Sequence, residues 1–242
     1  MISPPGRIRR SNNVPQGMQQ IFDILCRPGS NLPRRLMKIP GREDLSVTTQ
    51  TWKQDTGFDD GDIGLKKFRA AITMGGTPVA GMVFSEYAIQ THITESGLFF
   101  FLDSLSHLSG AFAQIILDNW CFDDLMDICT PEIRIVAFDE LWVANEARAH
   151  GVWIPVAQHI IRKRYQGKCD MLFLKPFPTE FEGILGEEDH YAQAQFSRRR
   201  SAMMKLYSRA MSVQPIRMRN SDECWMYSPM REDIPEPALR AS

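Results

Sequence analysis

The sequence predicts an α/β fold in which a mixed, splayed β-sheet is flanked by helices. The stretch 135–176 has the pattern of a strand, a short loop, an amphipathic helix and a second strand. A crossover of this length joins parallel strands. Two further strand-like runs flank Gly75-Gly76 and predict an antiparallel hairpin over 68–84. Parallel and antiparallel pairs together make the sheet mixed.

The 135–176 unit is the clearest element of the chain. Ile135–Val143 is rich in β-branched and aromatic residues, which favours a strand. Helical spacing of apolar residues runs over Val152–Tyr165, with Pro155 in the first turn, where a missing N–H costs nothing. Met171–Leu174 is wholly apolar, as in a strand buried on both faces.

Composition excludes several classes of protein. The chain has 242 residues, is 43% hydrophobic and has a net charge of −1, so it can bury a core of one domain and shows no general preference for nucleic acid. No stretch resembles a signal peptide or a membrane span. The five cysteines show no CxxC pair, which indicates reduced thiols in a cytoplasmic protein without a metal site. They are Cys26, Cys121, Cys129, Cys169 and Cys224.

The N-terminal residues 1–42 form a basic extension, with eight Arg or Lys residues against the single acid Asp23. Apolar residues over Met18–Leu25 predict one short helix, started by Pro15. A solvated extension docked by this helix is favoured over an arm for an anionic partner. The acidic stretch 55–62 is expected to be a loop, because it lacks the terminal Glu of a calcium site.

The segment 97–134 is expected to be a helical insertion. Leu98–Phe101 favours a strand, and 105–116 then has the spacing of an amphipathic helix capped by Asp103 or Ser104. Gly110 inside this helix costs about 1 kcal/mol relative to Ala. The insertion could form a wall of a substrate site or a contact in a homodimer, and the sequence does not choose between these.

The C-terminal part is predicted to add a helix over 188–210 and a closing strand pair, 216–218 with 223–227. Arg198-Arg199-Arg200 lies on the polar side of that helix, where a solvated face is favoured over a phosphate or acidic-partner site. From Pro229 the chain is rich in proline and charge and is expected to be a loose tail, so the main domain covers 43–228.

The joint between the 135–143 strand and the next helix resembles a known motif. A helix N-terminus offers unpaired N–H groups to an anion. Leu141, Val143, Glu146, Arg148 and Gly151 agree with the acyl-CoA-binding segment of the GNAT acetyltransferase superfamily: Leu-x-Val, a loop, Arg or Gln, two residues and Gly.

The resemblance covers roughly the last half of the chain and has two departures. Trp153 stands where the motif has a second small residue. Lys205–Arg209 is similar to the family's Leu-Tyr helix, but Met211-Ser212 replaces the usual Gly-Phe. The indole could point into the helix–sheet core or crowd a pyrophosphate group.

The resemblance implies a divergent GNAT member that takes acetyl-CoA or another acyl-CoA as co-substrate, without a metal, and transfers the acyl group directly to an amine. The 97–134 insertion would then precede the CoA-binding strand. The pantetheine arm would bond to the strand backbone, and the pyrophosphate would rest on amides at the helix start. The implied cofactor-binding residues are Trp142, Val143, Arg148, Ala149, His150, Gly151, Val152 and Trp153.

The implied catalytic residues are Tyr207 and Glu140. Tyr207 matches the family's tyrosine acid, which can protonate a thiolate if its pKa is lowered in the site. Asp139 and Glu140 should point to opposite sheet faces by alternation, so only one faces the substrate. We expect Glu140 to be the general base that takes the proton from the amine, and a water relay is the alternative. Tyr207 could instead be a core aromatic, and Arg148 with Gly151 a plain turn.

Two functions are consistent with the sequence. The first is a CoA-dependent N-acetyltransferase acting on a small-molecule or protein amine, favoured by the Arg148–Gly151 loop and Tyr207. The second is a catalytically inactive GNAT-fold interaction protein, favoured by Trp153 and the missing Gly-Phe. No membrane or nucleic-acid partner is expected. The sequence has no GxxxxGK, GxGxxG, HExxH or GxSxG motif.

Overall fold

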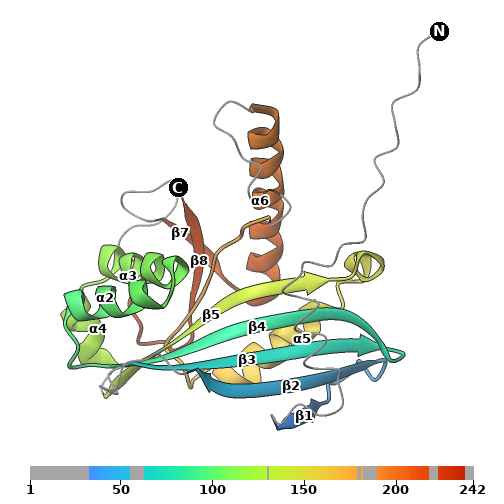
Figure 1. The fold of residues 1–242 in the computed structure, drawn as a ribbon, viewed down its shortest axis with the longest axis horizontal. Helices are drawn as coiled ribbons and strands as arrows, with labels where there is room; N and C mark the ends of the chain where they lie inside the picture. The colour runs from blue at the N-terminus through green and yellow to red at the C-terminus, as the bar shows by residue number, and fades with distance from the viewer. Residues whose placement is uncertain are drawn as a thin grey trace.

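The computed structural model describes residues 33–54, 63–129, 131–178, 181, 190–217 and 223–237. In these residues a single eight-stranded mixed sheet has the order β1-β2-β3-β4-β5-β6-β8-β7, with helices on both faces (Figure 1). The α/β class and the mixed, splayed, helix-flanked sheet predicted from the sequence are therefore confirmed.

The elements have the following bounds. The strands are β1 (Arg34–Met37), β2 (Leu45–Gln54), β3 (Ile63–Met74), β4 (Thr77–Gln90), β5 (Glu132–Val143), β6 (Met171–Leu174), β7 (Gln214–Arg217) and β8 (Cys224–Pro229). The helices are α2 (Glu95–Leu105), α3 (His107–Asn119), α4 (Phe122–Ile128), α5 (Trp153–Ile160) and α6 (His190–Met211). A 3₁₀ turn, η1 (Asn145–His150), precedes α5, and a π-helical turn, η2 (Ile161–Tyr165), follows it. The sheet begins at Arg34, inside the predicted N-terminal extension.

The predicted hairpin is confirmed as β3 and β4. Gly75 and Gly76 have φ angles of 56° and 83°, a left-handed pair that closes a tight turn between Met74 and Thr77. The two strands then pair over their full length, which places them at the centre of the sheet between β2 and β5.

The predicted parallel pair is confirmed as β5 and β6, but the pairing is short. It runs from Ile135↔Met171 to Phe138↔Leu174. Beyond Phe138, β5 continues to Val143 and pairs with β4 but not with β6. The chain after β6 enters the proline-rich segment 175–178. Figure 1 shows β5 running alongside β3 and β4 while β8 and β7 rise away from them. We call this opening past Phe138 and Leu174 the splay.

The two sheet faces carry separate cores. Alternate residues of the strands, such as Phe84 and Leu172, pack with α5 and α6 in the first core. The intervening residues, such as Ile135 and Phe173, pack with α2, α3 and α4 in the second core. The predicted helical insertion ahead of β5 therefore covers the sheet face opposite α5.

Two details of the insertion differ from the sequence prediction. Leu98–Phe101, predicted as a strand, is part of α2, because Leu98 and Leu102 are one helical turn apart and both are buried. The cap of α3 is Ser106 rather than Asp103 or Ser104, and its hydroxyl accepts the Ser109 N–H at 3.1 Å. A Cβ on Gly110 would lie 3.1 Å from the Asp103 Cα, so close packing of α2 on α3 requires this glycine.

The segment after Pro229, predicted as a loose tail, is packed against the domain through residue 237. Met230 and Ile234 are buried, and the Trp120 indole donates to the Pro235 carbonyl at 2.8 Å. The buried Asp170 holds this segment, since its carboxylate accepts the Arg134 N–H at 2.6 Å and the Arg231 guanidinium at 2.7 Å.

Other predictions are located as follows. The helix over Met18–Leu25 and the acidic loop over 55–62 lie outside the described residues. No helix in the described part of the chain is long and apolar enough to cross a membrane. Four of the five cysteines are described, and each has a free thiol: Cys121, Cys129, Cys169 and Cys224.

We predict that Asp170→Ala lowers the free energy of unfolding by about 1–3 kcal/mol, because the Arg134 backbone N–H loses its acceptor and the Arg231 guanidinium keeps only the exposed Asp233. Urea denaturation measures this loss. Asp233→Ala is the matched control: it removes an exposed carboxylate from the same Arg231 and should leave stability nearly unchanged. Equal effects of the two substitutions would contradict the structural role of Asp170.

Candidate functional site

The chain leaves β5 through a tight turn that leads into the first turn of α5. Residues 145–150 form the 3₁₀ turn η1, and Gly151 then takes a left-handed conformation with φ of 55°. A side chain at position 151 would be strained and would meet Ile154 Cδ1 at 3.2 Å. The N–H groups of Val152 and Trp153 follow directly, and first-turn amides have no partner inside the helix. This turn meets the backbone requirement of an anion site.

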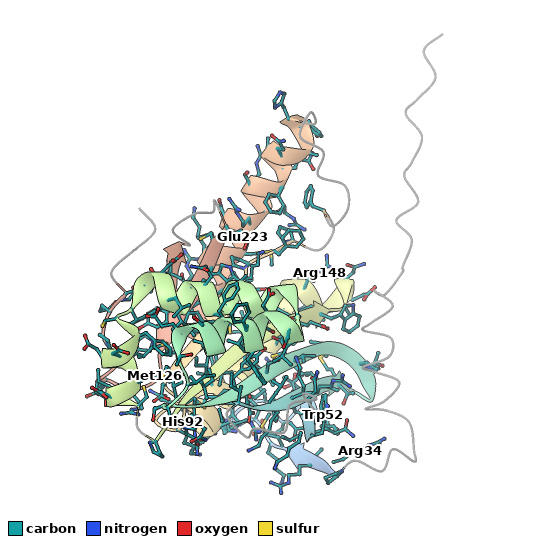
Figure 2. All side chains as sticks on the ribbon, turned by 60° about the vertical axis from the view of Figure 1, so that its left-hand side comes forward. Arg34, Trp52, His92, Met126, Arg148 and Glu223 are labelled. Carbon is teal, nitrogen blue, oxygen red and sulfur yellow. The ribbon has the colours of Figure 1, made fainter. Side chains whose placement is uncertain are left out.

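Arg148 braces this turn. Its Nε donates to the Val143 carbonyl at 3.3 Å, which ties the turn back to the last residue of β5. The guanidinium is otherwise exposed at the outer end of the turn (Figure 2). Ala149 and His150 are likewise exposed. A cation therefore lies within the same short turn as the first amides of α5.

Trp153 points into the helix–sheet core. It is 4% exposed and packs edge-on against Tyr207, with 5.9 Å between ring centroids and 73° between ring planes. Of the two orientations left open by the sequence, the indole takes the one inside the first core. The bulky residue therefore replaces a small one on the buried side of α5, while its backbone N–H stays in the first turn.

Tyr207 lies at the splay. Its ring packs edge-on against Phe138, the last β5 residue paired with β6, at 6.2 Å between centroids. Burial raises the pKa of Tyr207 to about 12. The sequence argument required a lowered pKa for proton transfer to a thiolate, and the structure shows the opposite shift. Tyr207 thus stays protonated across the physiological range and can act as a hydrogen-bond donor.

Asp139 and Glu140 lie at a β-bulge, so the alternation expected from the sequence is wrong here. Val83 pairs with Glu140 and Phe84 with Phe138, which leaves Asp139 as the extra residue of β5. The two residues of a bulge that oppose one partner residue point to the same side of the sheet. Both carboxylates therefore lie on the face opposite α5 and Tyr207.

Asp139 is held in a polar network inside the sheet. Its Oδ2 accepts the Lys67 ammonium at 3.0 Å and also the Ser85 hydroxyl, and Lys67 in turn donates to the Ser85 hydroxyl. Burial raises the pKa of Asp139, while the Lys67 charge and the Ser85 hydrogen bond oppose that rise. Each member comes from a different strand, so the network fixes Asp139 across β3, β4 and β5.

Glu140 is more accessible and less tightly held. Partial desolvation raises its pKa, the neighbouring Asp139 raises it further, and Arg69 and Lys67 lower it. Arg69 itself stacks over the Trp52 ring at 4.3 Å from guanidinium carbon to ring centroid. An accessible carboxylate can accept a proton, and a raised pKa makes it a stronger base.

The structure thus places the sequence-predicted residues near the splay, but on both faces of the sheet. Trp142, Val143 and the residues 148–153 follow β5 along the splay, and Tyr207 lies at its closed end. Glu140 lies on the opposite sheet face. Lys67 and Ser85 were missed, because each is a single polar residue within a strand and no motif marks it. In the described part of the chain no group of His, Cys, Asp or Glu could hold a metal ion.

Comparison with known proteins gives remote similarities of structure. No family model and no curated protein matches the sequence. A solved mutant of KacT has 10% identity and a TM-score of 0.30 and covers 69% of this chain and 71% of its own. An apo agmatine N-acetyltransferase mutant has 11% identity and a TM-score of 0.33, with coverages of 66% and 75%.

A third structure, the Drosophila melanogaster polyamine N-acetyltransferase, has 10% identity and a TM-score of 0.32 and covers 66% of this chain and 72% of its own. Similarity at this level assigns neither an activity nor a substrate. A function must therefore be inferred from the residues of this chain.

We predict that the burial of Tyr207 makes stability fall as the pH rises from about 10 to about 12. The unfolded chain loses the phenolic proton near the ordinary pKa, while the folded chain keeps it, so the folded state loses relative stability in this window. The loss should be on the order of 2–3 kcal/mol, the energy of a two-unit shift. Tyr207→Phe should remove this part of the slope in urea denaturation curves, and an unchanged slope would contradict a buried phenol.

Proposed function

We propose that the protein is a CoA-dependent acyltransferase, most specifically an N-acetyltransferase that transfers the acyl group directly to an amine. The observation that carries this proposal is the splay. It combines a β5 edge without a β6 partner, a turn with a left-handed Gly151 that leads into the first turn of α5, and Tyr207 at the closed end.

The extended edge of β5 suits the pantetheine arm, which carries amide groups and can bond to strand backbone at Val143, since the Trp142 backbone pairs with Gly81 of β4. The pyrophosphate would rest on amides from Ala149 to Trp153, where the helix start favours negative charge. Arg148 would add a charged contact and keep its hydrogen bond to the Val143 carbonyl. That bond uses Nε, and a guanidinium has five N–H donors in all.

In the proposed reaction the acceptor amine attacks the thioester carbonyl, so an N–C bond forms and the C–S bond breaks. Glu140 takes the proton from the acceptor's ammonium, directly or through a water molecule. The leaving thiolate accepts a hydrogen bond from Tyr207. Full transfer of the phenolic proton is uphill, because the pKa of Tyr207 is about 12 and that of a thiol is about 8.5. The attacking nitrogen gives its second proton to water as the amide forms, and water supplies a proton to the thiolate.

The same pKa favours a second candidate, a catalytically inactive interaction protein. A phenol with a pKa of about 12 is a poor acid, and Tyr207 would then serve only to pack Phe138 against Trp153. One measurement separates the two functions. Only the acyltransferase releases CoA from acetyl-CoA when an amine is present.

We predict that CoA binds and raises the melting temperature, since a ligand at 100 times its Kd stabilises the native state by about 2.7 kcal/mol. Gly151→Ala should weaken CoA binding about tenfold or more in calorimetric titrations, because the turn that presents the amides is distorted. The matched control is Gly75→Ala. Gly75 has nearly the same positive φ but lies in the β3–β4 turn, so this substitution should lower stability alone. No binding at millimolar CoA would reject the acyltransferase.

We predict that Glu140→Gln lowers kcat about 10²–10⁴-fold and removes the acidic limb of the pH–rate profile. Asp139→Asn should shift that limb to lower pH, because the negative charge that raises the pKa of Glu140 is lost. The sign follows from like-charge repulsion: without it, Glu140 gives up its proton at a lower pH. Steady-state kinetics across pH measures both effects, and an unchanged limb in Glu140→Gln would exclude Glu140 as the base.

A further inference from the structure

A pocket of about 250 Å³ lies at the carboxyl end of β6. Its lining residues are Lys175, Pro176, Phe177, Phe196, Arg200, Glu223 and Cys224. Lys175 and Pro176 directly follow Leu174, the last β6 residue paired with β5, so the pocket adjoins the splay. The opposite wall comes from α6, and Figure 2 shows Glu223 near the base of this helix. We call this cavity the β6-end pocket.

Aromatic rings form much of the wall. Phe177 and Phe196 lie with ring centroids 5.5 Å apart, and Phe181 packs edge-on behind Phe196 at 5.8 Å. Pro176 adds a further apolar surface. The volume is below the 300–1,000 Å³ or so that is usual for drug-sized ligands. The pocket therefore suits a small molecule with an apolar or aromatic body.

The charges of the pocket leave one cation in excess. Lys175 Nζ lies 2.6 Å from Glu223 Oε1, so these two charges compensate each other. The Arg200 guanidinium lies over the Phe196 ring at 5.2 Å from its centroid. No described carboxylate forms an ion pair with Arg200. Stacking on the ring leaves the guanidinium edge available for hydrogen bonds.

We propose that the β6-end pocket binds a small organic carboxylate with an apolar body. Arg200 would bind the carboxylate through two parallel hydrogen bonds, and the body would lie against Phe177 and Phe196. A single positive charge without an acidic partner among the described residues matches a monoanion, and it disfavours an acceptor that carries only positive charge. Charge, ring lining and size thus point to one class of ligand.

This inference also deepens the proposed function and, in this part, rests on it. The pocket begins one residue beyond the point where β5 and β6 separate. A ligand held there by its carboxylate can direct an amine toward a thioester lying in the splay. The acceptor would then be an amine that also carries a carboxylate and an apolar group, as in an apolar amino acid.

Calorimetric titration with 3-phenylpropionate tests the pocket without any CoA. We expect binding to the unmodified protein, a loss of affinity of about tenfold or more in Arg200→Gln, and no change in Arg198→Gln. Arg198 is an exposed cation of the same helix that does not line the pocket, so it is a matched control. Phenethylamine, which has the ring but a positive charge, and inorganic phosphate, which lacks the ring, should each bind at least about tenfold more weakly.

No binding of 3-phenylpropionate, equal losses in the two variants, or equal binding of phenethylamine would overturn the inference. The acceptor role is tested by measuring CoA release from acetyl-CoA with L-phenylalanine as the acceptor. The substitution Arg200→Gln should raise the KM for L-phenylalanine about tenfold or more while CoA affinity stays unchanged. Binding of 3-phenylpropionate by a protein that does not bind CoA would support the pocket and reject the proposed function. Release of CoA with phenethylamine but not with L-phenylalanine would reject the acceptor role alone.

Discussion

The short parallel pairing of β5 with β6 is the constraint on which the rest of the site depends. It ends at Phe138 and Leu174, because the chain after β6 contains Pro176 and Pro178. A proline has no N–H and therefore cannot continue a ladder. From Asp139 to Val143, β5 then pairs with β4 and no longer with β6. Both the β5 edge and the β6-end pocket arise where these two chains separate.

The β-bulge of β5 lies where the β5–β6 pairing ends, and it sets which side chains lie on each face of the sheet. Asp139, the extra residue, comes immediately after Phe138. It places two carboxylates on one face, while the aromatic contact of Phe138 with Tyr207 lies on the other. Lys67 neutralises the more buried carboxylate, which leaves Glu140 as the one with fewer partners. Glu140 and Tyr207 therefore lie on opposite faces of the sheet.

Local sequence patterns predicted the elements that depend on periodicity. The apolar run Met171–Leu174, the spacing of 152–165 and Gly75-Gly76 each specify local structure within a few residues, and the structure contains each one. Leu98–Phe101 was predicted wrongly, because four consecutive apolar residues carry no period of their own. The helix is set instead by the buried contacts of Leu98 and Leu102.

Features that depend on distant residues could not be predicted from local patterns. Lys67 and Asp139 are 72 positions apart, and Trp120 and Pro235 are 115 apart. The bulge at Asp139 has no marker in the sequence, since an extra residue in a strand is defined only by its partner strand. The polar network, the packed C-terminal segment and the common face of the two carboxylates were therefore seen only in the structure.

Trp153 explains how the site accommodates its departure from the motif. A residue in the first turn of a helix directs its N–H along the axis and its side chain to one side. The N–H of residue 153 therefore stays at the N-terminal end of α5, while the indole packs between α5 and α6 against Tyr207. A small residue at this position would leave Tyr207 without that partner. The bulky side chain thus fixes α6 against the splay, and the same helix carries Arg200 to the β6-end pocket.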